Sequence, residues 1–158
     1  MKKTLLFITL FITGVCFAQK YEGMEFYDNG EPKYIKTYKE SKGKLELVKL
    51  VSWHRNGQKE AEGTFKDGKL DGKHTSWHEN GQKRYEGTEK NNNYDGLWIY
   101  WYENGQKSSE GIYKDGEFDG LWIVWYENGQ KNREETYKDG ELISGKCWDE
   151  DGNEKECK

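Results

Sequence analysis

The dipeptide Asn-Gly recurs at a fixed interval along this sequence of 158 residues. Four copies lie 24 residues apart, each preceded by Trp-x-x and followed by Gln-Lys: Asn56-Gly57, Asn80-Gly81, Asn104-Gly105 and Asn128-Gly129. An earlier copy at Asn29-Gly30 and a degenerate one at Asp151-Gly152 extend the series. Such a period indicates a repeat architecture, in which each unit packs chiefly against its neighbours.

A second series of turn dipeptides interleaves with the first, at Asp67-Gly68, Asn91-Asn92, Asp115-Gly116 and Asp139-Gly140. Asn-Gly and Asp-Gly between alternating apolar residues are the strongest short-range hairpin signal, because type I′ turns need positive φ at both central positions. The turns fall alternately 11 and 13 residues apart, which leaves room for strands of five to seven residues and none for helices. The sequence therefore predicts an all-β antiparallel meander of about eleven or twelve strands, with one hairpin per repeat.

A two-residue turn at Asn104-Gly105 would place Tyr102 opposite Lys107, and Trp98 opposite Gly111. A large ring beside a strand glycine covers backbone that would otherwise be bare. Alternation then divides the middle repeats into two faces. The aromatic face carries Trp98, Tyr100, Tyr102, Tyr113, Trp122, Val124 and Tyr126, and the aliphatic face carries Leu97, Ile99, Trp101, Ile112, Leu121, Ile123 and Trp125.

Aliphatic residues are scarce, and on composition alone the chain approaches the disordered class. The sequence holds 7 Trp and 11 Tyr, however, and each ring can bury roughly 150–250 Å². An aromatic core can replace an aliphatic one if its rings lie in register. A single-layer sheet cannot bury both faces by itself, so we expect part of the apolar surface of one face to be left over as a partner site.

Residues 111–120, Gly-Ile-Tyr-Lys-Asp-Gly-Glu-Phe-Asp-Gly, match the G-x-[WY]-x-x-G-x-x-x-G core of MORN repeats. With its 24-residue spacing and Tyr-Glu-Asn-Gly-Gln-Lys segments, the chain over about residues 21–145 resembles the bacterial MORN-repeat variant, often named the YwqK family of antitoxins. Trp98 and Trp122 stand where the eukaryotic motif has a further glycine. The resemblance implies an open, twisted, single-layer meander with a groove, and roles in protein contact, membrane attachment or toxin neutralisation.

The first 18 residues differ from the rest: Met1-Lys2-Lys3, an apolar run and Ala18 are typical of a signal peptide. We therefore expect a single exported domain over residues 19–158, with five hairpin repeats and a degenerate C-terminal copy, in the periplasm, at the cell surface or secreted. Without Lys2 and Lys3 the chain has 23 basic against 29 acidic residues, a net charge of −6. This balance argues against nucleic acid as a partner, because phosphate binding needs excess Lys and Arg.

Two cysteines, Cys147 and Cys157, remain after removal of the signal peptide. An even pair in an exported chain favours a disulfide. A three-residue turn at Asp151-Gly152-Asn153 would place the two directly opposite each other, whereas a two-residue turn would put them out of phase. The alternative is a pair of thiols on a disordered tail.

Reactive chemistry finds little support in the sequence. His74 and His78 are four residues apart on one predicted strand, roughly 13 Å, so we expect no shared metal ion. Turn chemistry explains the Asp-Gly-x-x-Asp-Gly units better than calcium binding. The recurring Glu62, Glu86, Glu110 and Glu134 suit a solvated ladder better than a tuned acid and base. We expect no catalytic residues, no cofactor and no enzyme activity.

Two ladders are candidate binding sites. The basic ladder consists of Lys59, Lys83, Lys107 and Lys131, which could meet anionic lipid or polysaccharide, or could simply protect strand ends from aggregation. The aromatic ladder consists of Trp98, Tyr100, Tyr102, Tyr113, Trp122 and Tyr126, which could bind a ligand or could form the core.

The leading functional hypothesis is a non-enzymatic module that holds another protein, including a toxin for which it would be the immunity factor. The runner-up is carbohydrate or cell-envelope binding through the aromatic face, and the third is membrane-surface attachment through the basic ladder. The sequence leaves the oligomeric state and the identity of the partner open.

Overall fold

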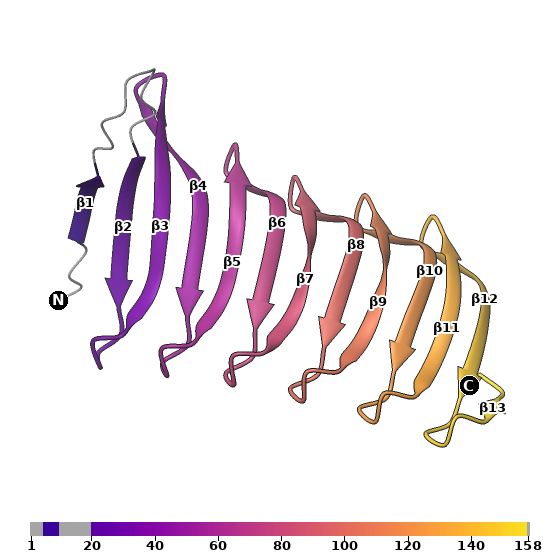
Figure 1. Ribbon diagram of the computed structural model, residues 1–158. Helices are drawn as coiled ribbons and strands as arrows, with labels where there is room; N and C mark the ends of the chain where they lie inside the picture. Colours follow the sequence, from indigo (N-terminus) through magenta and orange to yellow (C-terminus); the bar gives the residue numbers. More distant parts are fainter. Residues whose placement is uncertain (1–4, 10–19, 158) are drawn as a thin grey trace.

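The computed structural model describes residues 5–9 and 20–157, which form one open sheet of thirteen antiparallel strands in chain order (Figure 1). The strands are β1 Leu5–Thr9, β2 Lys20–Phe26, β3 Pro32–Ser41, β4 Lys44–Trp53, β5 Lys59–Lys66, β6 Lys69–Trp77, β7 Lys83–Lys90, β8 Asn93–Trp101, β9 Lys107–Lys114, β10 Glu117–Trp125, β11 Lys131–Lys138, β12 Glu141–Trp148 and β13 Glu154–Lys155. The predicted all-β meander is confirmed. The predicted signal peptide, β1 apart, lies outside the described residues and stays a prediction.

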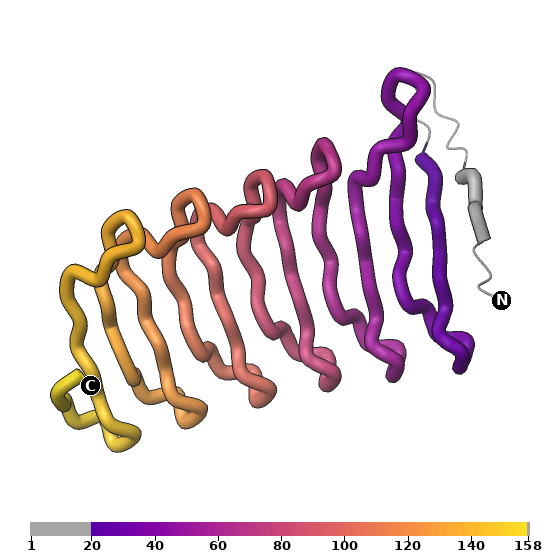
Figure 2. Tube along the Cα trace, turned by 180° about the vertical axis from the view of Figure 1, so that it is seen from behind, coloured from indigo at the N-terminus to yellow at the C-terminus, as the bar shows by residue number. Residues whose placement is uncertain are grey.

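The strands lie side by side in a single layer, with the two turn series along opposite edges of the ribbon (Figure 2). Strands β3 to β12 are eight to ten residues long, longer than predicted, because pairing continues up to the turns. The hairpin of β3 and β4 is the longest, and its tip projects beyond the other turns in Figure 1. The described residues contain no helix, and so none that could cross a membrane.

Type I′ turns form along one edge, as predicted. Asp115 and Gly116 have φ angles of 52° and 92°, and the three related dipeptides also have positive φ at both positions. Lys42-Gly43 forms a further turn of this kind, at the tip of the long hairpin. At this edge Gly116 N–H donates to Tyr94 C=O of the preceding repeat, at 2.9 Å.

The prediction of two-residue type I′ turns at the Asn-Gly edge is wrong. Gly105 has a φ of 83°, but Asn104 is not in the positive region. Gly105 N–H donates to Tyr102 C=O and Tyr102 N–H donates to Gln106 C=O, which is a three-residue loop ending in a glycine bulge. Lys107 consequently pairs with Trp101 rather than with Tyr102, although Trp98 pairs with Gly111 as predicted.

The asparagine side chains stabilise these turns, and each one links two repeats. Asn104 Oδ1 accepts the N–H of Gln106 within its own turn, and its Nδ2 donates to Glu127 C=O in the next repeat, at 3.0 Å. The same link, at 2.7–3.0 Å, is made by Asn29, Asn56, Asn80, Asn104 and Asn128. We call this series the asparagine ladder.

A second series of side chains runs parallel to it. Tyr102 Oη donates to Trp125 C=O of the next repeat at 2.7 Å, and Tyr27 and Tyr126 make the equivalent bond. His54 and His78 occupy the tyrosine position in two repeats, where Nε2 lies 3.0 and 2.9 Å from the corresponding Trp carbonyl. Because a carbonyl only accepts, Nε2 carries the proton in both.

The core lies on the aromatic face, where indole rings cover strand glycines. A Cβ on Gly87 would lie 2.2 Å from Trp98 Cδ2, and one on Gly111 would lie 1.8 Å from Trp122 Cε3. Each ring therefore leans toward the preceding strand: Gly111 pairs with Trp98 on one side and with Trp122 on the other, and Trp122 covers it. Only a residue without a side chain allows this close approach.

We predict that Gly111→Ala destabilises the fold by at least about 2 kcal/mol, because the added methyl forces Trp122 out of its position. Gly23→Ala is the matched control: its Cβ would meet Tyr38 at an ordinary 3.8 Å. Urea unfolding followed by Trp fluorescence measures both, and equal midpoints for the two variants would contradict the packing described above.

Candidate functional site

Four of the six residues predicted for the aromatic ladder come together. Trp98 and Tyr100 have ring centroids 6.1 Å apart, and Tyr113 lies 5.3 Å from Trp122. The cluster extends to further rings at 3.9–6.3 Å: His74, Tyr85, Tyr94, Phe118 and Tyr137. Tyr102 and Tyr126 instead lie in the turns at the edge, where they link repeats.

The indoles of this cluster are core rather than open surface. Trp98 is 0% exposed and Trp122 is 8% exposed. Trp98 Nε1 donates to Thr88 C=O at 3.0 Å, and Tyr94 stacks on its ring. The two Trp rings are therefore not available for stacking on a sugar.

The aliphatic face retains exposed apolar side chains in the middle of the sheet. Leu97 is 54% exposed, Ile112 is 45% and Leu121 is 47%. Leu97 pairs with Ile112 across β8 and β9, and Ile112 Cδ1 reaches to within 4.0 Å of a Cβ position on Gly120, beside Leu121. We call these three residues the aliphatic patch.

The patch is specific to β8, β9 and β10. In the two preceding repeats Lys49 and Lys73 replace the leucines, and they pair with Thr64 and Thr88 in place of Ile112. Comparison of positions 24 residues apart would have shown this change from polar to apolar in the sequence.

The basic ladder is engaged in internal contacts on the same face, nearer the Asn-Gly edge. Each lysine forms an ion pair of 2.5–2.9 Å with the glutamate three residues on: Lys59–Glu62, Lys83–Glu86, Lys107–Glu110 and Lys131–Glu134. Each Nζ also lies 4.9–5.9 Å from the indole centroid of a Trp in the next repeat, within cation–π range. These lysines thus bind their own sheet.

Neighbouring lysines reinforce two of these glutamates. Lys49 and Lys59 hold the pKa of Glu62 below its ordinary value, and Lys83 and Lys73 do so for Glu86. A hollow of about 250 Å³ lies between the two groups, with Thr75 and Trp77 in its lining. Its carboxylates are already paired, which leaves little unmet charge for a small ligand.

The histidines are dispersed. His74 lies on the aromatic face, where Nδ1 is 2.8 Å from Oε1 of the buried Glu89, whereas His78 belongs to the turn series. Within residues 5–9 and 20–157, no group of three His, Cys, Asp or Glu side chains is placed to hold a metal ion.

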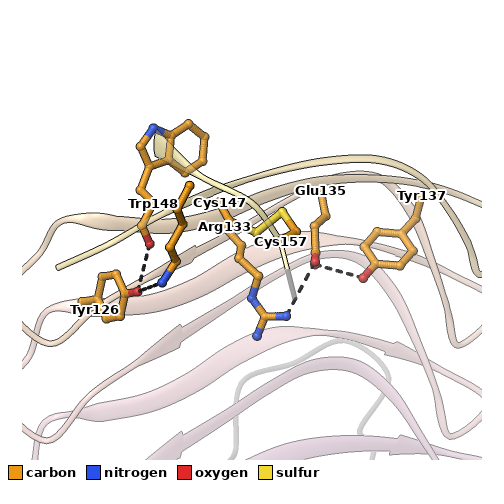
Figure 3. Close-up of a disulfide and its surroundings, with 8 residues drawn as sticks. Tyr126, Arg133, Glu135, Tyr137, Cys147, Trp148 and Cys157 are labelled. Atoms are coloured by element: carbon orange, nitrogen blue, oxygen red, sulfur yellow. Dashed lines mark hydrogen bonds and ion pairs between the residues drawn. A yellow bond between two sulfur atoms is a disulfide. The ribbon is translucent and has the colours of Figure 1, made fainter. Parts of the chain in front are cut away.

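A disulfide between Cys147 and Cys157 holds the last hairpin (Figure 3). The loop is 150–152, one residue earlier than predicted, so Lys155 and not Cys157 lies opposite Cys147. The Cα atoms of the two cysteines are 5.3 Å apart. A cross-link closing so short a loop contributes roughly 3 kcal/mol in the chain-entropy model, which opposes fraying of β13.

The last copy of the repeat lacks the donors that link the others. Asp149 and Asp151 replace the Tyr and Asn positions, and no following repeat offers an acceptor within the described chain. Asp149 instead accepts the N–H groups of Asp151 and Asn153 in its own turn. The preceding copy still donates to this one, through Tyr126 Oη to Trp148 C=O (Figure 3).

We predict that stability falls as the pH rises above about 10, because Tyr100 in the cluster stays neutral when folded. Burial raises the pKa of Tyr100 above the ordinary 10.0, and a hydrogen bond with Tyr113 adds to the shift. The unfolded chain therefore releases this proton at a lower pH than the folded chain, and stability is lost as the pH rises. In urea unfolding at pH 8 and 11, Tyr100→Phe should lose less stability than the native chain; equal losses would contradict this.

The sequence matches a protein family described as MORN repeat variant over residues 22–40, 70–91, 94–115 and 118–139, together more than half of the chain. No curated protein matches the chain. The matched segments fall on the hairpins of the sheet, and the chain therefore belongs to the MORN repeat variant family.

Proposed function

We propose that this chain is an exported, non-enzymatic binding module that holds a protein partner on its aliphatic patch. MORN repeats are generally binding modules. The observation that carries the proposal is the exposure of Leu97, Ile112 and Leu121 side by side on a sheet in which Trp98 and Trp122 are buried. Contiguous exposed apolar surface is typical of protein contact sites.

The aromatic face and the basic ladder are less suited to the two alternative functions. Carbohydrate binding would use open aromatic rings, but Trp98 and Trp122 are buried. Membrane attachment would use free lysines, but the basic ladder is paired with glutamates and indoles of its own sheet. The finer proposal is that the partner is an exported toxin, for which this chain is the immunity factor; it rests on the resemblance to antitoxin repeats.

We predict that replacing Leu97 and Leu121 together by Ser abolishes partner binding without unfolding the sheet, because both side chains are exposed. The measurement is recovery of co-purifying protein with the tagged chain from its own cells. Leu142→Ser is the matched control: Leu142 is also exposed but lies on β12, outside the patch.

A partner recovered in stoichiometric amount with the native chain and the control, and lost with the double variant, supports the proposal. Equal recovery with all three proteins would show that the patch is not the site. Circular dichroism of each variant confirms that the sheet is intact.

A further inference from the structure

The aliphatic patch has carboxylates beside it on the same face. Asp95 and Leu97 are two residues apart on β8, and Asp119 and Leu121 repeat the arrangement on β10. Gly96 and Gly120 have positive φ and lie at register shifts, so alternation alone does not place these carboxylates. Asp95 pairs with Thr88 and Thr88 pairs with Lys73, which places Asp95 on the aliphatic face. Asp119 occupies the equivalent position one repeat on. Asp95 and Asp119 are half-exposed, and neither carboxylate has an ion pair or hydrogen bond with the described residues.

These carboxylates differ from the glutamates elsewhere on this face. Glu62, Glu86, Glu110 and Glu134 each have a lysine partner. Lys114 is paired with Asp139 at 3.8 Å. Asp95 lines a hollow in which two lysines, Lys66 and Lys90, are outnumbered by four carboxylates. The turn segment 114–119 contains one lysine against three acidic residues, whereas the equivalent segment 66–71 contains two of each. The apolar patch therefore borders a locally acidic rim.

Over the whole chain, the excess of acidic residues lies in the C-terminal part. Residues 102–158 contain 8 Lys and Arg against 15 Asp and Glu, so this part carries the negative charge of the mature chain. Unpaired carboxylates beside apolar surface are costly to cover, because a partner that desolvates them must supply cations or hydrogen-bond donors. A cationic partner meets that requirement and is also steered toward the site.

We propose that the partner docks through a basic apolar segment, with Lys or Arg against Asp95 and Asp119 and apolar side chains on Leu97, Ile112 and Leu121. This proposal deepens the proposed function and rests on it. An anionic lipid surface would be repelled by the same rim.

The test uses two labelled twelve-residue peptides of Leu and Ala, one with four Lys and the other with four Glu, and fluorescence anisotropy with the full mature chain. We expect the Lys peptide to bind at least tenfold more tightly than the Glu peptide, and its affinity to fall as NaCl is raised. Asp95→Ser with Asp119→Ser should weaken Lys-peptide binding about tenfold, as expected for two exposed ion pairs. The charge-matched control, Glu154→Ser with Glu156→Ser on the last hairpin, should leave it unchanged.

Three results would overturn the inference: equal or no binding of the two peptides, equal effects of rim and control variants, or flotation of the chain with vesicles of phosphatidylcholine and phosphatidylserine. The double variant, Leu97→Ser with Leu121→Ser, distinguishes failure of this inference from failure of the proposed function. If that variant loses both peptides while the native chain binds both equally, the patch remains a protein site and only its preference for a basic partner is wrong. If it keeps both, both proposals fail.

Discussion

A sheet one layer thick has no second layer to cover it, so one of its faces must bury itself with its own side chains. Here the burial is achieved by large rings that lie flat over glycines of the adjacent strand, as Trp98 does over Gly87 and Trp122 over Gly111. Burial of rings stabilises a chain that is poor in aliphatic residues. The aromatic face is therefore buried on folding, whereas part of the opposite face stays exposed.

Hydrogen bonds between repeats fix the alignment of consecutive hairpins at both edges of the sheet. The asparagine ladder links consecutive turns on one edge, and turn glycines donate to the preceding repeat on the other. The hydrogen bonds of the sheet alone would permit slippage of one hairpin against the next, whereas these side-chain links fix the register. The terminal copy has acidic residues at the linking positions and a disulfide, which together close the array at this end.

Much of this architecture was predictable, because turn dipeptides and the 24-residue period are local signals. The pairing of Trp98 with Gly111 was predicted from the position of the turn, and it holds because a bulge after Tyr100 offsets the extra loop residue. Which of the two faces keeps exposed apolar surface was left open by the sequence. The loop type at Asn104 was not predictable in the same way, because Asn-Gly suits both turn types. The sequence also does not specify whether an indole ring covers the glycine of the preceding strand or that of the following strand.

The assignment of the two faces is the central claim, and hydroxyl-radical footprinting with mass spectrometry of residues 19–158 tests it most directly. The account predicts slow oxidation of Trp98 and Trp122, together with rapid oxidation of Leu97, Ile112 and Leu121 for side chains of their intrinsic reactivity. Rapid oxidation of the two indoles, with protection of the three aliphatic residues, would mean that the faces are reversed and would contradict the account.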